Sequence, residues 1–234
     1  MVLHRQLLRG LSALALWSLM LGPAIPEDGH VDVDVALALA IDVSYSVDNL
    51  EHRLQMEGFA QALQSDEVMK AIQGGRHQRI AVMVYQWSDA DNQQVIVPWT
   101  VVASEADAAR VGKILSDGRR NVKEGGTAIS AALIYGAEQF ATAPGADRRV
   151  IDLATDGRNN IGRPTYVARD FVLAQGITIN GLAISNEWKQ LAVYLERQVI
   201  GGNLSFVEEA KTYDDFGATM LRKLVREITG PGVT

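Results

Sequence analysis

The sequence predicts an α/β fold with a doubly wound, mostly parallel sheet, one antiparallel edge strand and helices on both faces. Short apolar runs alternate with segments of helical periodicity along nearly the whole chain, as in repeated strand-helix-strand units. Two of the runs are joined by only a short polar loop, which is typical of an antiparallel hairpin. The chain has 234 residues, 47% of them hydrophobic, which is enough for one domain with a full core.

The first expected strand covers residues 33–41. This apolar run is too short and too rich in valine for a helix with one polar face. A helix with Asp48 as its N-cap follows, and after a break near Ser65 a second helical segment reaches Ile72. The start of the chain therefore predicts a buried strand followed by two helices.

Residues 79–87 and 94–101 are expected to be two strands joined by the polar loop 88–92. The short loop predicts an antiparallel pair. Pro98 has no backbone N–H to donate to a neighbouring strand, so the second strand is expected at an edge of the sheet.

The rest of the chain continues to alternate helices and strands. Gly176 suits the left-handed cap that ends a helix before the next strand. The expected helices are 104–115, 127–140, 165–175 and 188–198, and a terminal helix that carries Phe216, Met220 and Leu224. The expected strands are 149–154, 177–184 and 205–210.

The N-terminal segment differs from the rest of the chain. A basic start is followed by an apolar run and then by small residues at 22–24, where a signal peptidase would read them. We expect a signal peptide at residues 1–24, a linker at 25–30 and the domain at 31–230. The alternative is an uncleaved anchor, but the apolar run is shorter than the roughly 20 residues of a spanning helix. The predicted location is the periplasm or the extracellular space, with no stable membrane insertion after cleavage.

Charge and cysteine content exclude several classes of function. The predicted cleavage removes two arginines and no acidic residue, so 20 basic and 28 acidic residues remain, a net charge of −8. This charge argues against nucleic acid or an anionic membrane as partner. The chain has no cysteine, so neither disulfides nor thiolate metal sites are available. Only His52 and His77 remain as plausible imidazoles within the fold, which disfavours histidine-based zinc or triad chemistry. We interpret both as surface residues.

Oxygen-bearing side chains stand in three loops at element ends: Asp42, Ser44 and Ser46 after the first strand, Thr127 before a helix, and Asp156 after a later strand. The carboxyl ends of parallel strands share one rim, so these residues are expected to converge. Two carboxylates and three hydroxyls suit Mg²⁺, Mn²⁺ or Ca²⁺. Each loop taken alone is weak evidence, because such residues more often form only a turn or a helix cap, and it is the occurrence of all three in order that favours a metal site.

Other polar residues are weaker candidates. Asn159 and Asn160 could support the third loop with their amides, or simply form an exposed turn. Asp89 and Asp91 are interpreted as a solvated turn rather than as part of the rim. Asp34 is expected to face water.

The motifs DVSYS, GGTAISAAL and ATDG resemble the metal-ion-dependent adhesion site of von Willebrand factor A (vWA) domains. In that family the two serines and the threonine bind the ion directly or nearly so, and the aspartates bind it directly or through water. The resemblance implies that Ser44, Ser46 and Thr127 are hydroxyl ligands and that Asp42 and Asp156 are the carboxylates.

The resemblance covers roughly residues 31–229. The segments VVASEAD, GITINGLAI and VIGGNLSFV are similar to those of a bacterial family of exported vWA-like proteins whose function is uncharacterised. Tyr45 stands where many relatives have glycine, so a phenol beside the ion could shield it or contact a partner.

Three classes of function follow. The leading hypothesis is a non-enzymatic binding module in which one divalent cation, Mg²⁺ before Mn²⁺ or Ca²⁺, accepts an acidic side chain of a partner protein. The second is a hydrolase or phosphoryl-transfer enzyme with the ion as Lewis acid, but the chain has no GxSxG, P-loop, HExxH or GxGxxG motif after the first strand. The third is a metal-free adaptor on the same fold.

Overall fold

The computed structural model describes residues 32–230. The predicted signal peptide at 1–24 and the linker at 25–30 lie outside these residues and stay predictions. Within residues 32–230, no helix is both long and apolar enough to span a membrane.

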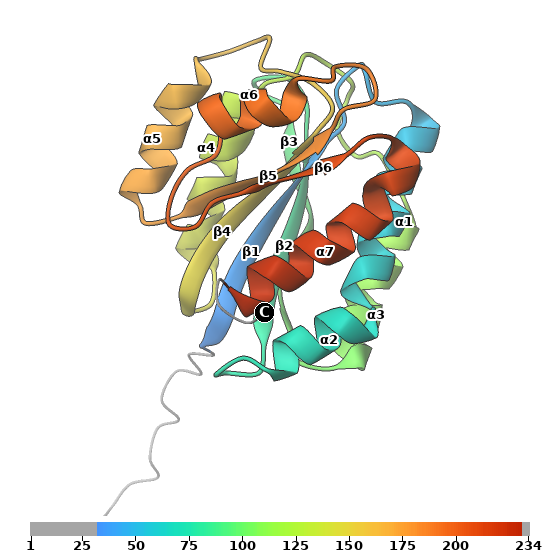
Figure 1. Cartoon of the computed structure of the whole chain (residues 1–234), viewed down its shortest axis with the longest axis vertical. Helices are drawn as coiled ribbons and strands as arrows, with labels where there is room; N and C mark the ends of the chain where they lie inside the picture. The colour runs from blue at the N-terminus through green and yellow to red at the C-terminus, as the bar shows by residue number, and fades with distance from the viewer. Residues whose placement is uncertain (1–31, 231–234) are drawn as a thin grey trace, which may run out of the picture. The chain divides into compact units, whose positions relative to one another are not determined.

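A six-stranded sheet forms the centre of the domain, in the order β3-β2-β1-β4-β5-β6 (Figure 1). Only β3 is antiparallel to its neighbour, and it lies at one edge. The strands are β1 (Val33–Asp42), β2 (Ile80–Trp87), β3 (Gln93–Val102), β4 (Ala146–Thr155), β5 (Thr178–Ile184) and β6 (Val207–Ala210). The predicted fold class is confirmed, including the hairpin and the edge position of Pro98.

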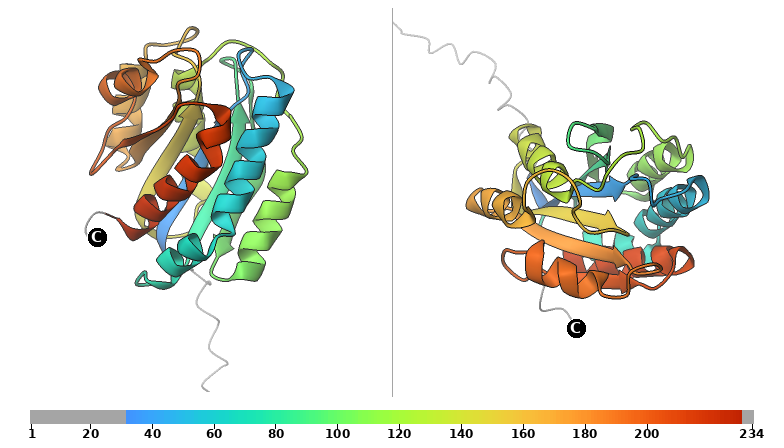
Figure 2. Two further views of the ribbon diagram at one scale, coloured as in Figure 1. Left: turned by 45° about the vertical axis from the view of Figure 1, so that its right-hand side comes forward. Right: turned by 90° about the horizontal axis from the view of Figure 1, so that it is seen from above.

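Seven α-helices cover the two faces of this sheet (Figure 2). Four of them enclose the core on one face: α1 (Asn49–Leu63), α2 (Asp66–Gln73), α3 (Glu105–Ser116) and α7 (Phe216–Thr229). The other core lies beneath α4 (Ile129–Gln139), α5 (Thr165–Ala174) and α6 (Leu191–Gln198). β1 is buried along its whole length because both faces are covered, which accounts for its unbroken apolar run.

Several element ends differ from the sequence expectations. β4 begins three residues before the expected start at 149, because its first residues pair with the start of β1, as Val33 does with Ala146. α4 begins at Ile129 rather than 127, which leaves Thr127 in the preceding loop. α6 begins at Leu191 rather than 188. Asp48 caps α1 as expected.

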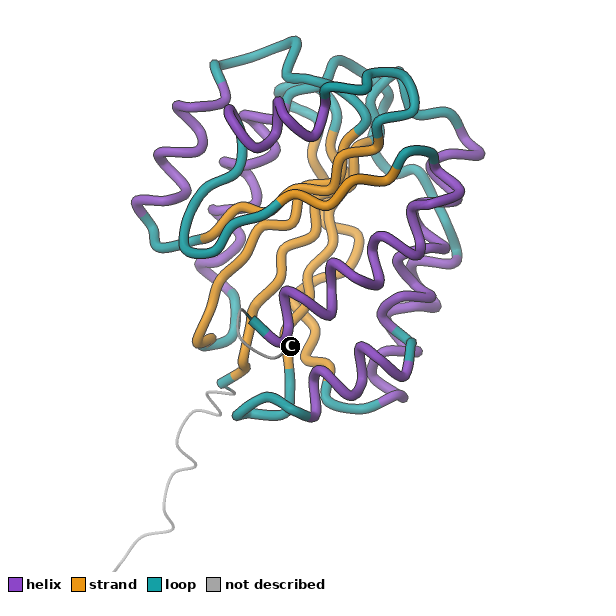
Figure 3. The backbone as a smooth tube through the Cα atoms, in the orientation of Figure 1, coloured by secondary structure: helices purple, strands orange, loops and turns teal. Residues whose placement is uncertain are grey.

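The carboxyl ends of β1, β2 and β4 lie side by side at the same end of the sheet. The register pairs Asp42 with Trp87 of β2 and Ile41 with Ala154 of β4. The loops that follow these strands therefore gather there, as Figure 3 shows along the upper edge. We call this end of the sheet, formed by the carboxyl ends of its strands, the rim. The three motif loops should lie there.

Candidate metal centre

Asp42 holds the last position of β1, and its side chain is completely buried. Its Oδ1 accepts a hydrogen bond from the backbone N–H of Ser44 at 2.8 Å, and its Oδ2 accepts one from the Thr155 hydroxyl at 2.6 Å. Thr155 ends the neighbouring strand β4. The two adjacent strand ends thus fix the orientation of the Asp42 carboxylate.

Ser44, Ser46 and Asp156 lie next to one another although they come from two different loops. The hydroxyls of Ser44 and Ser46 are 3.3 Å apart, and the Ser46 hydroxyl donates to Oδ1 of Asp156 at 2.7 Å. Oδ2 of Asp156 accepts the phenol of Tyr213 at 3.0 Å. Ser44 and Asp156 are buried and Ser46 is exposed, so the group opens to solvent on the Ser46 side.

Thr127 has a hydroxyl that its helix does not use. The N-cap of α4 is Ala128, and no side chain caps that helix end. Asn160 supports Thr127 instead, since its Oδ1 accepts the backbone N–H of Thr127 at 2.8 Å and its Nδ2 donates to Oγ1 at 3.4 Å. Oδ1 of Asn159 accepts the N–H of Ser130 at 3.1 Å. Both asparagines therefore hold the start of α4 in place.

A hollow of about 470 Å³ brings Thr127 together with the other two loops. Arg158 and Trp188 form one side of it, with the guanidinium 5.9 Å from the centre of the indole ring. The lining residues are Ser46, Thr127, Asp156, Gly157, Arg158, Asn160, Glu187 and Trp188. Residues from all three motif loops therefore border one open space.

The charges of this group suit a dication. Burial, and after it the neighbouring Asp156, raise the pKa of the Asp42 carboxyl to about 7. Two carboxylates held this close oppose each other's ionisation, and a bound cation would remove that cost. The hydroxyls and carboxylates supply only hard oxygen donors, which are the preferred ligands of Mg²⁺ and Ca²⁺. The residues present therefore fit a divalent cation.

The structure thus places Asp42, Ser44, Ser46, Thr127 and Asp156 at one rim. Their binding of a metal stays a prediction. Two other residues at this site have no role in the sequence prediction. Thr155 belongs to the ATDG motif, so its position was visible in the sequence, whereas Tyr213 lies 57 positions after Asp156 and carries no local signal.

Tyr45 and the hairpin acids lie around the rim with different exposures. The Tyr45 side chain is 75% exposed, and its backbone N–H donates to the carbonyl of Gly125 at 3.0 Å. This bond joins the DVSYS loop to the loop that carries Thr127. Asp91 is exposed, as expected for a solvated turn. Asp89 differs from that expectation, since it is half-buried and lies close enough to Gly125 that a Cβ there would come within 2.9 Å of its Cβ. Its Oδ1 accepts the N–H of Ala90 within the turn.

The interpretation of His52 as a surface residue is wrong. Its side chain is buried, and Nε2 lies 3.0 Å from Nε2 of Gln86. Gln86 also donates to the carbonyl of Arg119 and accepts the N–H of Asn121, so the connection between α3 and α4 packs over this part of α1 and β2. Burial, followed by the charge of Arg120, lowers the pKa of His52 to about 4.

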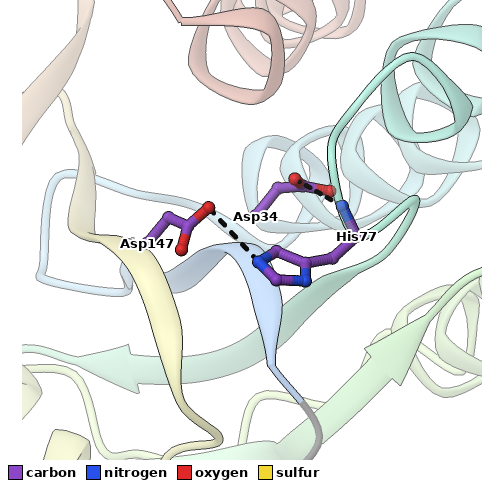
Figure 4. A group of neighbouring side chains, drawn as sticks. All are labelled: Asp34, His77 and Asp147. Atoms are coloured by element: carbon purple, nitrogen blue, oxygen red, sulfur yellow. Dashed lines mark hydrogen bonds and ion pairs between the residues drawn. The ribbon is translucent and has the colours of Figure 1, made fainter.

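The expectation that Asp34 faces water is also wrong, since it lies within β1 and is only 8% exposed. Its Oδ1 and Oδ2 accept the backbone N–H groups of His77 and Arg79 at 2.9 and 3.3 Å. His77 is half-buried, and its Nε2 lies 3.3 Å from Oδ2 of Asp147 (Figure 4). Asp34, His77 and Asp147 each offer a ligand atom, all within 4.8 Å of one another, and could hold a metal ion. They lie at the opposite edge of the sheet from Asp42.

Comparison with known proteins places the chain in a family and assigns its fold. The profile of a family described as "Protein of unknown function (DUF1194)" matches residues 32–232. A search of curated proteins returned no significant match.

Three solved structures share the fold at low sequence identity. Proximal thread matrix protein 1 from the mussel byssus, with a zinc-occupied metal-ion-dependent adhesion site, is 18% identical with a TM-score of 0.65, over 86% of this chain and 49% of that one. The von Willebrand factor type A protein from Catenulispora acidiphila is 17% identical (TM-score 0.59), over 86% and 44% of the two chains. The von Willebrand factor domain of the type V pili tip protein Mfa5 from Porphyromonas gingivalis is 11% identical (TM-score 0.55), over 86% and 98%.

The chain spans about half the length of the byssus protein, so the match concerns only part of that structure. At these identities the comparison establishes the fold. The order of strands, the helices on both faces and these neighbours all agree. The chain therefore belongs to the DUF1194 family and has the fold of vWA domains.

Proposed function

We propose that this domain is a non-enzymatic binding module that holds one divalent cation at the rim and, through it, binds a carboxylate of a partner protein. Asp42, Ser44, Ser46, Thr127 and Asp156 would hold the ion. The observation that carries the proposal is the contact of Ser46 with both Ser44 and Asp156 beside the hollow that Thr127 lines.

The ligand set explains why a partner carboxylate would bind there. Neutral hydroxyls leave the ion electron-poor, and the two aspartates balance a dication without excess negative charge. The cation when bound supplies a Lewis-acidic position for an external oxygen ligand. We expect Mg²⁺ first, with Mn²⁺ and Ca²⁺ as the other candidates. The byssus neighbour with zinc at its adhesion site supports a divalent cation without naming the ion used here.

Export is part of the same proposal. The apolar N-terminal run and the small residues at 22–24 support a signal peptide, which would deliver the domain to the periplasm or the extracellular space. The neighbour from a pili tip protein supports a location outside the cytoplasm.

Calorimetry with Mg²⁺, Mn²⁺ and Ca²⁺ tests the metal site. We expect saturable one-site binding, and we expect Asp42→Ala to weaken it by at least about tenfold, since even indirect metal partners have effects of that size. Asp91→Ala is the matched control because it removes an exposed acid of the hairpin turn. An equal affinity in wild type and Asp42→Ala would refute the site, and no binding of any cation would favour the adaptor hypothesis.

A pull-down from envelope extracts tests the partner. Wild type with Mg²⁺ should recover proteins that are lost with EDTA and lost with Asp42→Ala. Recovery of the same proteins under all conditions would contradict metal-dependent binding. Metal-dependent turnover above the Asp42→Ala control in a phosphatase, esterase and protease screen would favour the enzyme hypothesis instead.

A further inference from the structure

The connection between α3 and α4, residues 117–128, carries Thr127 near its end and Arg120 near its start. Arg120 belongs to none of the three motifs. Its side chain is only 13% exposed, which is low for an arginine outside a helix or strand. A guanidinium this buried needs hydrogen-bond acceptors within the protein.

The guanidinium of Arg120 binds the loop 43–48 between β1 and α1, which we call the DVSYS loop, on both sides of its serines. Nη1 donates to the carbonyl of Val43 at 3.2 Å, before Ser44. Nη2 donates to the carbonyls of Val47 at 2.7 Å and Asp48 at 3.1 Å, after Ser46. Three carbonyls of one short loop thus share a single side chain. The distance between the Ser44 and Ser46 hydroxyls, 3.3 Å, depends on the backbone conformation of this loop, which these bonds stabilise.

The segment that carries Arg120 is itself fixed to the sheet. Gln86 of β2 bonds the backbone on both sides of Arg120, at Arg119 and Asn121. The hydroxyl of Ser88 donates to the carbonyl of Lys123 at 2.6 Å. Arg120 therefore has a rigid base, and it joins the loop of Ser44 and Ser46 to the segment that ends in Thr127.

We infer that Arg120 is a positioning residue for the rim site, holding the DVSYS loop in the conformation that aligns the Ser44 and Ser46 hydroxyls with Thr127. The inference rests on the proposed metal site for its effect on cation binding. The effect on loop order does not depend on a metal.

The planar fork of arginine explains why this residue type is needed. A guanidinium presents donors in fixed directions and can reach several carbonyls at once, whereas a lysine ammonium is a compact point charge on a flexible stem. Arg120→Lys keeps the charge and most of the length, so it isolates the geometry of the donors. Arg120→Ala removes both.

Arg148 provides a matched control at the far edge of the sheet. It is half-buried, and its Nη1 and Nη2 donate to the carbonyls of Glu227 and Ile228 at 2.6 and 2.7 Å. Arg148→Lys should therefore lower stability in a comparable way without touching the rim.

The experiment compares wild type, Arg120→Lys and Arg148→Lys by calorimetry with Mg²⁺ and by amide hydrogen exchange in EDTA. For Arg120→Lys we expect a Mg²⁺ dissociation constant raised on the order of tenfold and faster exchange confined to residues 43–48. Arg148→Lys should bind Mg²⁺ like wild type, with faster exchange only at the end of α7. If Arg120→Lys does not fold, the same measurements on Arg120→Gln replace it.

The outcomes separate this inference from the proposed function. If wild type binds Mg²⁺ and Arg120→Lys binds it equally well with unchanged exchange at 43–48, the positioning role is refuted while the metal site stands. If wild type binds no cation, the metal site fails. Exchange at 43–48 then still decides whether Arg120 orders the loop.

Discussion

Asp42 is a buried carboxylate whose two oxygens are both bonded by its own surroundings. The bond from Thr155 joins the ends of two neighbouring strands, and the Thr155 hydroxyl also lies 3.2 Å from the N–H of Gly157, beyond Asp156. One hydroxyl group thus orients the first carboxylate of the site and shapes the loop that carries the second. Its loss should affect both aspartates.

Thr155→Val tests this role. The change keeps the shape of the side chain and leaves the buried Asp42 oxygen without its donor, so we expect the free energy of unfolding to fall by about 1–3 kcal/mol. Urea denaturation in EDTA measures the loss. Thr142→Val is the control, since that hydroxyl is exposed and donates only to the carbonyl of Gln139; it should change stability by less than about 0.5 kcal/mol. Equal effects of the two variants would contradict the assigned role.

Some residues of the site can be predicted from their neighbours in the sequence, and others depend on contacts with distant parts of the chain. Asp42 and Asp156 were visible because each directly follows an apolar run. Arg120 carries no such signal, since its partners are backbone carbonyls more than 70 positions away. His52 occupies a helix position that a polar residue normally exposes, and only the covering of α1 by a distant loop buries it.

The close packing of α1 against α7 depends on two glycines, Gly58 in α1 and Gly217 in α7. A Cβ atom on Gly58 would lie 2.9 Å from Cδ1 of Phe216 and 3.0 Å from the Cα of Gly217. The second of these atoms belongs to the backbone of α7, so the helix itself would have to move. The close approach of the two helices thus requires the absence of a side chain at position 58.

Gly58→Ala should therefore destabilise the domain by about 1–3 kcal/mol through overpacking, although alanine favours a helix by about 1 kcal/mol over glycine. Gly112→Ala is the matched control in α3. There the added Cβ would meet only the amide end of the Gln64 side chain, which can move away, so the change should be neutral or stabilising. Thermal unfolding of both variants decides the point. A higher melting temperature for Gly58→Ala would show that the helices separate at no cost.

Helices and strands can be predicted where a pattern of neighbouring residues alone determines them. The buried strands and the hairpin were identified because apolar runs and turn residues determine them within a few positions. The expected starts of β4 and α4 differ from the structure because the pairing of β4 with β1 and the support of Thr127 by Asn160 are long-range effects. The helix pattern of α7 was correctly identified, but its contact with α1 through Gly58 was not visible.

At the scale of the whole domain, a buried ionic group ties α7 to the sheet. Lys223 is fully buried, with Nζ 2.6 Å from Asp152 of β4 and 2.5 Å from Glu227. Asn180 of β5 donates to the same Glu227 oxygen at 2.8 Å. Burial, followed by Asp152, raises the pKa of Glu227 to about 7. In the sequence, Lys223 and Glu227 look like an ordinary solvent-exposed i, i+4 pair.

The raised pKa makes stability depend on pH. The folded domain holds a proton on Glu227 up to about pH 7, whereas the unfolded chain releases it near the usual value of 4.5. The folded state therefore binds more protons between these values, and the stability that this provides is lost as pH rises through about 7. Asp42, with its pKa also raised to about 7, acts in the same direction in the absence of metal.

We therefore expect the free energy of unfolding in EDTA to fall between pH 5 and pH 8. Glu227→Gln keeps an oxygen that can accept from Lys223 and Asn180 but cannot titrate, so it should flatten the fall. Urea titrations at several pH values measure this. A slope equal in wild type and Glu227→Gln would show that Glu227 does not carry the pH dependence.

Both ends of the described domain lie at the edge of the sheet away from the rim. Val33 starts β1 beside Ala146 of β4, and Arg148 bonds the carbonyls of Glu227 and Ile228 at the end of α7. A tether, tag or further domain joined at either end would therefore leave the opposite edge free to meet a binding partner. Immobilising the protein on a sensor surface through either end should present the candidate cation site to the solution.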